Sequence, residues 1–556
     1  MTTLVHRLLL LAAGLFCVGA QGTPVPFRPD LPAGAAYAID ARQLHPTQFS
    51  HGWREVVNKA AKISALSPGE LKAYLIDKDV PVVIGPAGVA YLTDGHHTLR
   101  ALIESTQADK TAYGHIFANW SDLAPDVFWA RMQANHYVYL KDAAGNRQPA
   151  TALPASLLDM QRDPWRGLAW GVMKAGGFKE KKGVFFQEFL WADYFRDRVR
   201  WDDTDDDSFK DAVMEASVLA QAPAAADLPG YRADALQPRV VTAQTKHDTD
   251  DPAIWINPAD PAQSLVIGTD KDADGALYVF DLDGKIVRTV PGLHRPNNVD
   301  VAYGLMLGGR PVDIAVTTER QEQRLRIFAL PEMRSVDRGD LVVFDGDTNR
   351  APMGIALYRR PRDGALFAIV GGKSGPAQGY LAQYRLEDDG TGHVKMTLVR
   401  MFGAYSGKKE IEAIAVDPEL GYVYYSDETV GVRKYAADPD APEANVELAL
   451  FGTTGFASDH EGISIYRRRD GTGYVLVSDQ QANAFQLFPR EGTPGHPHEH
   501  PRLDTIPVAA IESDGNEVTD RALGERFPHG LLVAMSNGRV FHYYAWEDVV
   551  QRAGLK

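Results

Sequence analysis

Short apolar or alternating runs, separated by Gly, Asp, Asn and Pro, fill the chain from about residue 240 to residue 550. Such runs predict short strands joined by tight turns. A propeller blade has four strands and takes roughly 40–50 residues, so a region of this length predicts about six blades. A large sandwich is the alternative that periodicity alone leaves open. The clearest runs are Ser264–Gly268, Leu277–Phe280, Asp313–Thr317, Leu325–Leu330, Ala365–Val370, Ile411–Val416, Tyr422–Ser426, Gly462–Tyr466, Tyr474–Ser478 and Leu531–Met535.

The preceding region, residues 37–220, instead carries helix-like runs at Gly69–Asp77, Thr98–Ser105 and Asp126–Ala134. A chain of 556 residues also favours two or more folded units. We therefore expect a multidomain protein in which an all-β six-bladed propeller follows a smaller α+β domain.

We place the α+β domain at residues 24–216, a linker at residues 217–239 and the propeller at residues 240–556. The linker contains Ala222-Pro223-Ala224-Ala225-Ala226 and Pro229-Gly230, which are typical of a connecting segment. The acidic run Asp202–Asp207 before it predicts a solvated loop and helix cap. It lacks the glycine and distal glutamate of an EF-hand loop.

Residues 1–20 predict a secretory signal peptide, with Arg7 in the positive segment, an apolar core at Leu8–Val18 and small residues for cleavage at Val18-Gly19-Ala20. A membrane anchor is the alternative, but the apolar core is shorter than the roughly 20 residues that span a bilayer. We expect a periplasmic or secreted protein with no membrane span after cleavage. Its mature chain would lose Cys17, the only cysteine, which excludes disulfides, thiolate zinc sites and a cysteine nucleophile.

The formal net charge of -15 argues against a protein that grips nucleic acid through a broad basic surface. It suits a protein that collects cations. An acidic enzyme can still bind an anionic substrate if metal ions lie between the two. We therefore expect no nucleic-acid partner, and the oligomeric state stays open.

Carboxylates and amides stand beside the predicted strand ends of the second region. Loops from successive blades converge at the ends of a propeller's channel, so such residues can share one pocket although they are far apart in sequence. Several hard oxygen ligands in one place are what Ca²⁺ requires. Singly, each acid is an ordinary turn former or cap, and only the ensemble points to metal. The set comprises Asp250, Asp251, Asn298, Asp300, Glu412, Asp427, Glu428, Glu461 and Asp514.

Three cations, Lys271, Arg320 and Lys373, follow predicted strands in similar places. Carboxylates, metal and these cations together would make a phosphate-processing site. The metal would polarise a phosphoryl oxygen and acidify a bound water, while Lys and Arg neutralise the equatorial charge. The alternative for each cation is an ordinary solvated residue at the rim.

Several segments in one order resemble the β-propeller phytases, also called 3-phytases, over residues 240–550. They are Asp250–Trp255, Gly268–Lys271, Asn297–Tyr303, Glu412–Ala415, Glu461–Tyr466 and Val477–Gln480 before Phe485–Phe488. The resemblance implies a six-bladed propeller that binds several Ca²⁺ ions. It also implies hydrolysis of the phosphomonoesters of calcium-bound phytate, with direct attack of a metal-activated water and no covalent phospho-enzyme.

The resemblance also implies roles for individual residues. Glu412, Glu428, Lys271, Arg320 and Lys373 would be catalytic, and the three cations with Gln480 would bind substrate. Asp250, Asp251, Asn298, Asp300, Glu412, Asp427, Glu428, Glu461 and Asp514 would be calcium ligands or water-positioning acids.

Three positions depart from the family pattern: Met353 replaces a tyrosine, Ser374 stands where an acid often follows the lysine, and the late acidic motif reads Ser513–Glu517. These changes concern one phosphate subsite. They keep two alternatives open, namely a related phosphoesterase with another phosphorylated substrate and a non-catalytic, calcium-stabilised binding propeller. The combined presence of the three cations and the acids argues against a pure binding module.

In the first region a predicted strand at Val89–Leu92 leads through Asp94-Gly95-His96-His97 into the helix at Thr98–Ser105. A helix N-terminus with two imidazoles can hold an anion, so Asp94, His96 and His97 form a candidate anion site. The alternative is a capped turn with two polar histidines.

Together with Leu44–Gln48, this segment resembles the ParB/sulfiredoxin-like superfamily, and more narrowly the ParB-like nucleases, over residues 37–190. A redox role like that of sulfiredoxin fails because no cysteine is present. Chromosome partitioning fits poorly with export and with the acidic charge. We assign no reaction to this domain.

Overall fold

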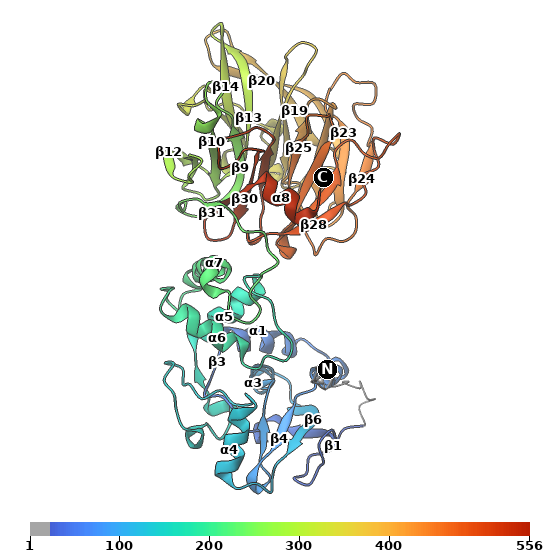
Figure 1. Ribbon diagram of the computed structural model, residues 1–556. Coiled ribbons are helices and arrows are strands. Elements are labelled where there is room, and N and C mark those ends of the chain that lie inside the picture. Colours follow the sequence, from blue (N-terminus) through green and yellow to red (C-terminus); the bar gives the residue numbers. More distant parts are fainter. Residues whose placement is uncertain (1–22, 556) are drawn as a thin grey trace, which may run out of the picture. The chain divides into compact units, whose positions relative to one another are not determined.

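The computed structural model describes residues 23–555, so the predicted signal peptide lies outside the described residues. The chain divides into two compact units (Figure 1). One comprises the chain up to Trp170 together with Lys182–Asp193, and the other comprises Gly171–Lys181 and the chain from Tyr194 onwards. The predicted linker, residues 217–239, begins inside a helix, α7 (Asp206–Gln221), and the exact domain boundary stays a prediction.

The first unit is built on a mixed five-stranded sheet in the order β1-β2-β6-β4-β5. Its strands are β1 (Val25–Pro26), β2 (Ala36–Asp40), β6 (Thr111–Asn119), β4 (Val82–Ile84) and β5 (Ala90–Leu92). The pairs β1–β2 and β4–β6 are parallel, whereas β2–β6 and β4–β5 are antiparallel. A short parallel pair, β3 (Ser50–His51) and β7 (Gln161–Arg162), forms a second sheet.

Helices of this unit lie close to the predicted positions. These are α2 (Pro68–Lys78), α3 (His96–Glu104) and α4 (Pro125–Ala134). The helices α1 (Trp53–Ser64), α5 (Pro164–Lys174) and α6 (Gln187–Arg196) were not predicted, and the last two extend into the second unit. The start of α2 is fixed by a capping box, because Ser67 and Glu70 satisfy each other's backbone N–H groups. The acidic run before α7 acts as the predicted cap, since the Asp205 carboxylate accepts from the backbone of Asp207 and Ser208.

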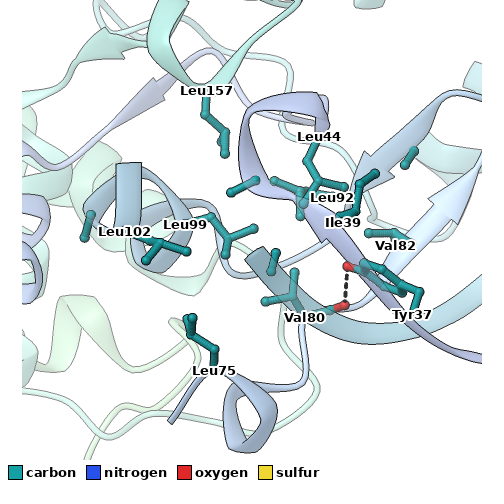
Figure 2. Close-up of a cluster of buried hydrophobic side chains, with 14 of the residues drawn as sticks. Tyr37, Ile39, Leu44, Leu75, Val80, Val82, Leu92, Leu99, Leu102 and Leu157 are labelled. Carbon is teal, nitrogen blue, oxygen red and sulfur yellow. Dashed lines mark hydrogen bonds between the residues drawn. The ribbon is translucent and has the colours of Figure 1, made fainter. Parts of the chain in front are cut away.

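The core of the first unit lies between the sheet and these helices. Figure 2 shows side chains from the sheet meeting side chains from α2 and α3, namely Ile39, Val82 and Leu92 with Leu75, Leu99 and Leu102. The hydroxyl of Tyr37 donates to the carbonyl oxygen of Val80 at 2.9 Å, so its one polar atom is satisfied inside the core.

The second unit is a propeller of six four-stranded sheets, which confirms the predicted fold class and rules out the sandwich. The first three blades are β9 (Thr249–Trp255), β10 (Leu265–Asp270), β11 (Gly275–Phe280) and β12 (Ile286–Leu293); β13 (Pro296–Leu307), β14 (Arg310–Glu319), β15 (Arg324–Ala329) and β16 (Arg334–Ser335); and β17 (Pro352–Arg359), β18 (Leu366–Gly372), β19 (Gln378–Asp388) and β20 (Val394–Ala404).

The last three blades close the ring. They are β21 (Ile414–Asp417), β22 (Tyr422–Asp427), β23 (Gly431–Ala436) and β24 (Ala449–Phe451); β25 (His460–Arg467), β26 (Gly473–Asp479), β27 (Ala484–Pro489) and β28 (Asp504–Pro507); and β29 (Asn516–Thr519), β30 (Leu531–Ser536) and β31 (Val540–Ala545) with β8 (Val240–Val241). Since β8 comes from before the first blade and pairs with β31, it joins the two ends of the ring. Helix α8 (Trp546–Ala553) follows the last blade.

One predicted strand begins later than expected, because Ile411–Val416 is extended only from Ile414. The residues before it lie against the neighbouring blade at Gly354, where a Cβ atom would stand 2.0 Å from the carbonyl oxygen of Glu412. This close approach requires glycine and displaces Glu412 from the sheet.

Candidate active site

The antiparallel pairing inside each blade gathers most of the predicted residues at one end of the propeller. The start of a blade's first strand lies beside the end of its second, as the pairs Thr249↔Asp270, Pro296↔Glu319 and His460↔Asp479 show. Residues just before or within the first strands therefore meet residues that follow the second strands. We call this set the rim site: Asp250, Lys271, Asn297, Arg320, Lys373, Lys409, Glu410, Glu412, Glu428, Asp459, Glu461, Gln480 and Asp514.

Lys271 links the first and last blades of the rim site. Its Nζ atom contacts Oδ1 of Asp250 and lies 3.3 Å from Oδ2 of Asp514. The other carboxylate oxygen of Asp514 accepts from the side-chain amide of Gln480. Burial lowers the pKa of Lys271, but the nearby carboxylates, Asp250 foremost, raise it well above its ordinary value. The lysine is therefore a fixed positive charge.

A fully buried amide, Asn297, connects the second blade to its neighbours. Its Nδ2 atom donates to Oδ2 of Asp250 at 3.0 Å and to Oε1 of Glu412. Its Oδ1 atom accepts from Nη1 of Arg320 at 3.4 Å. Asn297 thus holds two predicted acids and one predicted cation in a single hydrogen-bonded chain.

Two overlapping groups of carboxylates lie beside this chain. Glu410, Glu412 and Glu428 form one, and Glu428, Asp459 and Glu461 form the other, each with ligand atoms within 4.8 Å of one another. Two lysines balance part of this charge. Lys409 Nζ lies 2.7 Å from Oε2 of Glu428 and 2.9 Å from Oδ2 of Asp459, while Lys373 Nζ lies 3.0 Å from Oε2 of Glu410.

Burial makes these carboxylates hard to ionise without more positive charge. It raises the pKa of Glu428 to about 8, and Lys409 opposes that rise. Burial, and then the charges of Glu428 and Glu412, raises the pKa of Glu461 well above its ordinary value. Burial also raises the pKa of Asp250, while Lys271 opposes the shift. A bound cation would favour the ionised forms.

The carboxylate groups fit a calcium ion on an independent observation. Oε1 of Glu428 and Oε2 of Glu461 are buried and accept no hydrogen bond from any described residue. A buried acceptor without a donor is costly, so its presence indicates a ligand. Carboxylate oxygens gathered this closely are the hard donors that Ca²⁺ prefers.

Three further carboxylates, Asp251, Asp300 and Glu517, line a cavity of about 230 Å³ inside the channel. Two of them also join neighbouring blades, because Oδ2 of Asp251 accepts from the backbone N–H of Val299 at 3.0 Å and Oδ2 of Asp300 from that of Leu357 at 2.6 Å. Burial raises the pKa of Asp300 to about 6. The predicted ligand Asn298 lines the same cavity.

Comparisons with known proteins decide the family. Residues 211–544 match the sequence model of the family described as "Phytase". The chain belongs to the phytase family. Residues 37–197 of this phytase-family chain match the model described as "Putative ParB-like nuclease", so both resemblances drawn from the sequence are confirmed.

A curated relative of this phytase-family chain is the 3-phytase of Bacillus subtilis (strain 168), 30% identical over 340 residues, which are 56% of this chain and 85% of the relative. Among solved structures, protein Atu1540 from Agrobacterium tumefaciens is 35% identical and covers 35% of this chain and 95% of its own, with a TM-score of 0.32. The Dos1 propeller is 12% identical and covers 54% of this chain and 68% of its own, with a TM-score of 0.31.

Asp427 of the phytase propeller is engaged by side-chain and backbone contacts within its own surroundings. Its carboxylate accepts from the backbone and hydroxyl of Ser406, and its Oδ2 atom lies 2.9 Å from the Arg433 guanidinium. Asp427 is the last residue of β22, and Glu428 lies in the turn that follows it. The carboxylate of Asp427, predicted as a metal ligand, is occupied by these structural contacts.

Two of the departures from the phytase pattern have a structural explanation. The side chain of Met353 is buried, and its carbonyl oxygen accepts from the hydroxyl of Thr318 at 2.7 Å. The hydroxyl of Ser374 donates to the carbonyl oxygen of Asn349. Met353 therefore fills space behind the rim site, and Ser374 holds a loop beside Lys373.

The candidate anion site of the first unit has a different geometry from that expected. Nε2 of His96 accepts from the backbone N–H of Thr47, and Nε2 of His97 accepts from that of Gly52, both at 3.0 Å. Burial lowers the pKa of His96 to about 3 and that of His97 well below its ordinary value. Both imidazoles are therefore neutral near pH 7 and tie α3 to residues 47–52, while Asp94 accepts only from Gly95 among the contacts described.

Sequence reasoning missed five residues of the site: Asn297, Lys409, Glu410, Asp459 and Glu517. Three of them carried a signal, since two stand two residues from a predicted acid on an extended segment, where such residues share a face, and the third is adjacent to a predicted ligand. Glu410 stands two before Glu412, and Asp459 two before Glu461, while Asn297 directly precedes Asn298.

Among the described helices, we find none long and apolar enough to cross a membrane.

Proposed function

We propose that this phytase-family propeller is a calcium-dependent phosphomonoesterase that hydrolyses phytate, myo-inositol hexakisphosphate, by direct attack of water. The observation that carries the proposal is the pair of overlapping carboxylate groups with buried, undonated oxygens at Glu428 and Glu461. Cations lie directly beside them, with Lys373 next to Glu410 and Arg320 joined through Asn297 to Glu412. Carboxylate oxygens that can bind several Ca²⁺ ions thus lie beside lysine and arginine side chains that can bind phosphate.

The residues of the rim site divide into three roles. Lys271, Arg320 and Lys373 would bind the phosphate oxygens, and Gln480 would assist from its position beside Asp514. Glu412, Glu428 and Glu461 would hold calcium and orient the attacking water. Bound calcium would polarise a phosphoryl oxygen and lower the pKa of a water ligand.

Direct attack by water is favoured over attack by the one histidine next to these carboxylates, His460. His460 stands next to Glu461, but its Nε2 atom lies 2.7 Å from the carbonyl oxygen of Gly452. Its ring is also stacked on Phe456, with centroids 3.8 Å apart. The imidazole is therefore held away from the carboxylates.

Phosphate release from phytate by the purified chain tests the proposal, first with calcium and then with excess chelator. We expect release with calcium and at least a 100-fold decrease in chelator. The variant Glu428→Gln, which keeps the shape but removes the charge, should lose activity by a similar factor. Glu499→Gln, an exposed acid outside the rim site, is the matched control and should keep activity within twofold. Equal release with and without calcium would refute calcium dependence.

A second candidate is a phosphoesterase of the same mechanism with another phosphorylated substrate. The contact of Ser374 with Asn349 favours it, because the acid that often follows the lysine in the family is replaced by a hydroxyl that is already engaged. A panel of phosphorylated sugars and inositol phosphates separates the candidates. Preference for phytate supports the first, and a preference for another monoester supports the second.

Export is part of the same proposal and rests on residues 1–20, which lie outside the described residues. N-terminal sequencing of the protein from periplasmic and medium fractions tests it. Cleavage after Ala20 would support export. Recovery of the uncleaved chain from the cytoplasm would contradict it.

A further inference from the structure

The far end of the propeller channel opens into a second, larger cavity of about 1170 Å³. It lies where the first strands of the blades end, beside Ile256, Tyr303 and Thr519, whereas the rim site lies where they begin. Five basic residues line it: Arg467, Arg468, Arg469, Arg521 and His529. We call this cavity the basic cleft.

The charge of the basic cleft is unusual for a chain with a net charge of -15. Arg467 is neutralised, since it contacts Glu419 and lies 3.8 Å from Asp520. The other three arginines are weakly paired at most. Arg468 lies 3.9 Å from Asp470 and Arg521 lies 4.0 Å from the adjacent Asp520, while Arg469 has no ion pair among the described residues.

These three guanidinium groups are also accessible. Arg468 and Arg521 keep 42% and 67% of their side-chain surface, and Arg469 is exposed. Because their acidic partners lie no nearer than 3.9 Å, these guanidinium groups are only partly neutralised and repel one another. A polyanion in the cavity would relieve that repulsion and form paired N–H···O contacts.

The walls of the basic cleft are held in place by contacts of their own. The backbone N–H of Ile256 donates to the Tyr303 hydroxyl at 2.9 Å, and the Tyr466 hydroxyl donates to the carbonyl oxygen of His529 at 2.9 Å. The ring of Tyr466 is stacked on Trp546, with centroids 3.7 Å apart. The cavity is thus largely preformed, which lowers the entropic cost of binding.

The basic cleft is chemically separate from the rim site. It shares Ile254, Pro418 and Glu517 with the channel cavity, so the two cavities adjoin. The channel cavity is lined by Asp251, Asp300 and Glu517, and no lysine, arginine or histidine is among its described lining residues to pair with a phosphate ion. An anion in the cleft would therefore enter and leave from the solvent side.

We propose that the basic cleft binds a small polyanion with two or more phosphate groups, and that it does so without calcium. This inference does not rest on the proposed hydrolysis, because the guanidinium groups of Arg468, Arg469 and Arg521 have no close acidic partner among the described residues, whereas the lysines of the rim site are paired with its carboxylates. A small ligand is favoured over nucleic acid, since the cations line one concave cavity and the rest of the chain is acidic. The ligand could be an inorganic polyphosphate or a phosphorylated organic molecule, including a substrate or product of the enzyme.

Calorimetric titration of the full chain in chelator tests the inference. Pyrophosphate represents the inorganic source, phytate the organic source, and single inorganic phosphate a ligand with too few charges. We expect pyrophosphate or phytate to bind to the wild type at least 10-fold more tightly than inorganic phosphate. The triple variant Arg468→Ser, Arg469→Ser and Arg521→Ser should weaken that binding at least 10-fold. Which of the two binds more tightly identifies the source.

A matched control removes the same charge elsewhere, with Arg288→Ser, Arg310→Ser and Arg334→Ser at exposed positions outside the cleft lining. The control should keep wild-type affinity. A loss of affinity in the cleft variant alone then shows a specific site and not a general effect of net charge. Both triple variants should release phosphate with calcium at the wild-type rate. Three results would overturn the inference. They are equal affinity of the two triple variants, no binding to the wild type in chelator, and tighter binding of a single-stranded oligonucleotide than of pyrophosphate. If the wild type releases no phosphate from phytate with calcium, the proposed function is refuted, but the binding result in chelator still stands.

Discussion

The ammonium group of Lys409 lies 2.7 Å from Oε2 of Glu428, in the position that a cation would take beside a buried carboxylate. The same group lies 2.9 Å from Asp459. Lys409 keeps 43% of its side-chain surface, whereas Glu428 keeps only 1%. The lysine therefore acts as a counter-ion that reaches in from solvent.

This arrangement makes the role of Lys409 depend on calcium. Replacing it by methionine removes the counter-ion, so in chelator we expect the propeller to lose about 1 kcal/mol of stability, a value reduced for solvent exposure. With calcium in excess the metal would supply the charge, and the loss should be smaller. Urea unfolding of both proteins under the two conditions measures the difference. An equal loss with and without calcium would show that the ammonium does not substitute for the metal.

Calcium itself should stabilise the folded propeller. A ligand at 100 times its dissociation constant, bound only to the folded state, adds about 2.7 kcal/mol per site. We therefore expect the propeller transition to rise by roughly 5 °C or more when calcium replaces chelator. Magnesium at the same concentration is the control, because it demands a tighter octahedral site and should raise the transition less. An unchanged melting temperature would exclude calcium bound in the folded state.

The fold and the end of the propeller that carries the rim site could be predicted from the sequence, because acids at strand ends converge once the blades close. Period-two alternation explains which acids face where. Asp250 turns to Lys271 and Asp514, whereas Asp251 turns into the channel toward Val299. Asp427 ends β22 and contacts Arg433, whereas Glu428 in the following turn joins the carboxylate groups, so the metal-ligand role of Asp427 stays a prediction.

Other parts of the site depend on contacts that no local pattern encodes. Lys409 lies in an irregular segment whose path follows from its close approach to Gly354 of the neighbouring blade. Arg467, Arg468 and Arg469 lie at the turn between β25 and β26, and the packing of the fifth blade against the sixth places them beside Arg521. His96 and His97 indicated an anion site, but their burial and their contacts with residues 47–52 make them neutral acceptors.

A buried ion pair holds the fourth and fifth blades together. Nη2 of Arg490 lies 2.6 Å from Oδ1 of Asp417, and both side chains keep at most 1% of their surface. Replacing Arg490 by methionine leaves Asp417 buried without its partner, so we expect a loss of about 3–5 kcal/mol. Urea unfolding measures it. The control is Arg526→Ala, whose partner Asp283 is half exposed, with an expected loss of about 0–1 kcal/mol. Similar losses in the two variants would contradict the structural role of the buried pair.

The first unit should lose stability in mild acid because its buried histidines stay neutral. Burial, followed by the charges of Arg100, Arg162 and Arg166, lowers the pKa of His51 to about 4, and burial lowers that of His96 to about 3. Since both folded pKa values lie below the unfolded value of about 6.5, unfolding takes up protons below pH 6.5. Stability is therefore complete above pH 6.5 and falls as the pH drops toward 4. At pH 5 each such histidine lowers the free energy of unfolding of the first unit by about 2 kcal/mol.

Hydrogen exchange on the full chain measures this effect locally. The backbone N–H groups of Thr47 and Gly52 donate to His96 and His97, so their protection should fall between pH 6.5 and pH 4.5 after correction for intrinsic exchange. The variant His51→Phe removes one titrating group at similar volume and should make the decrease shallower. His136→Asn, at an exposed position of the same unit, should leave it unchanged. Protection that stays constant over this range would mean that the histidines do not gain protons when the unit opens, contrary to their buried, neutral state.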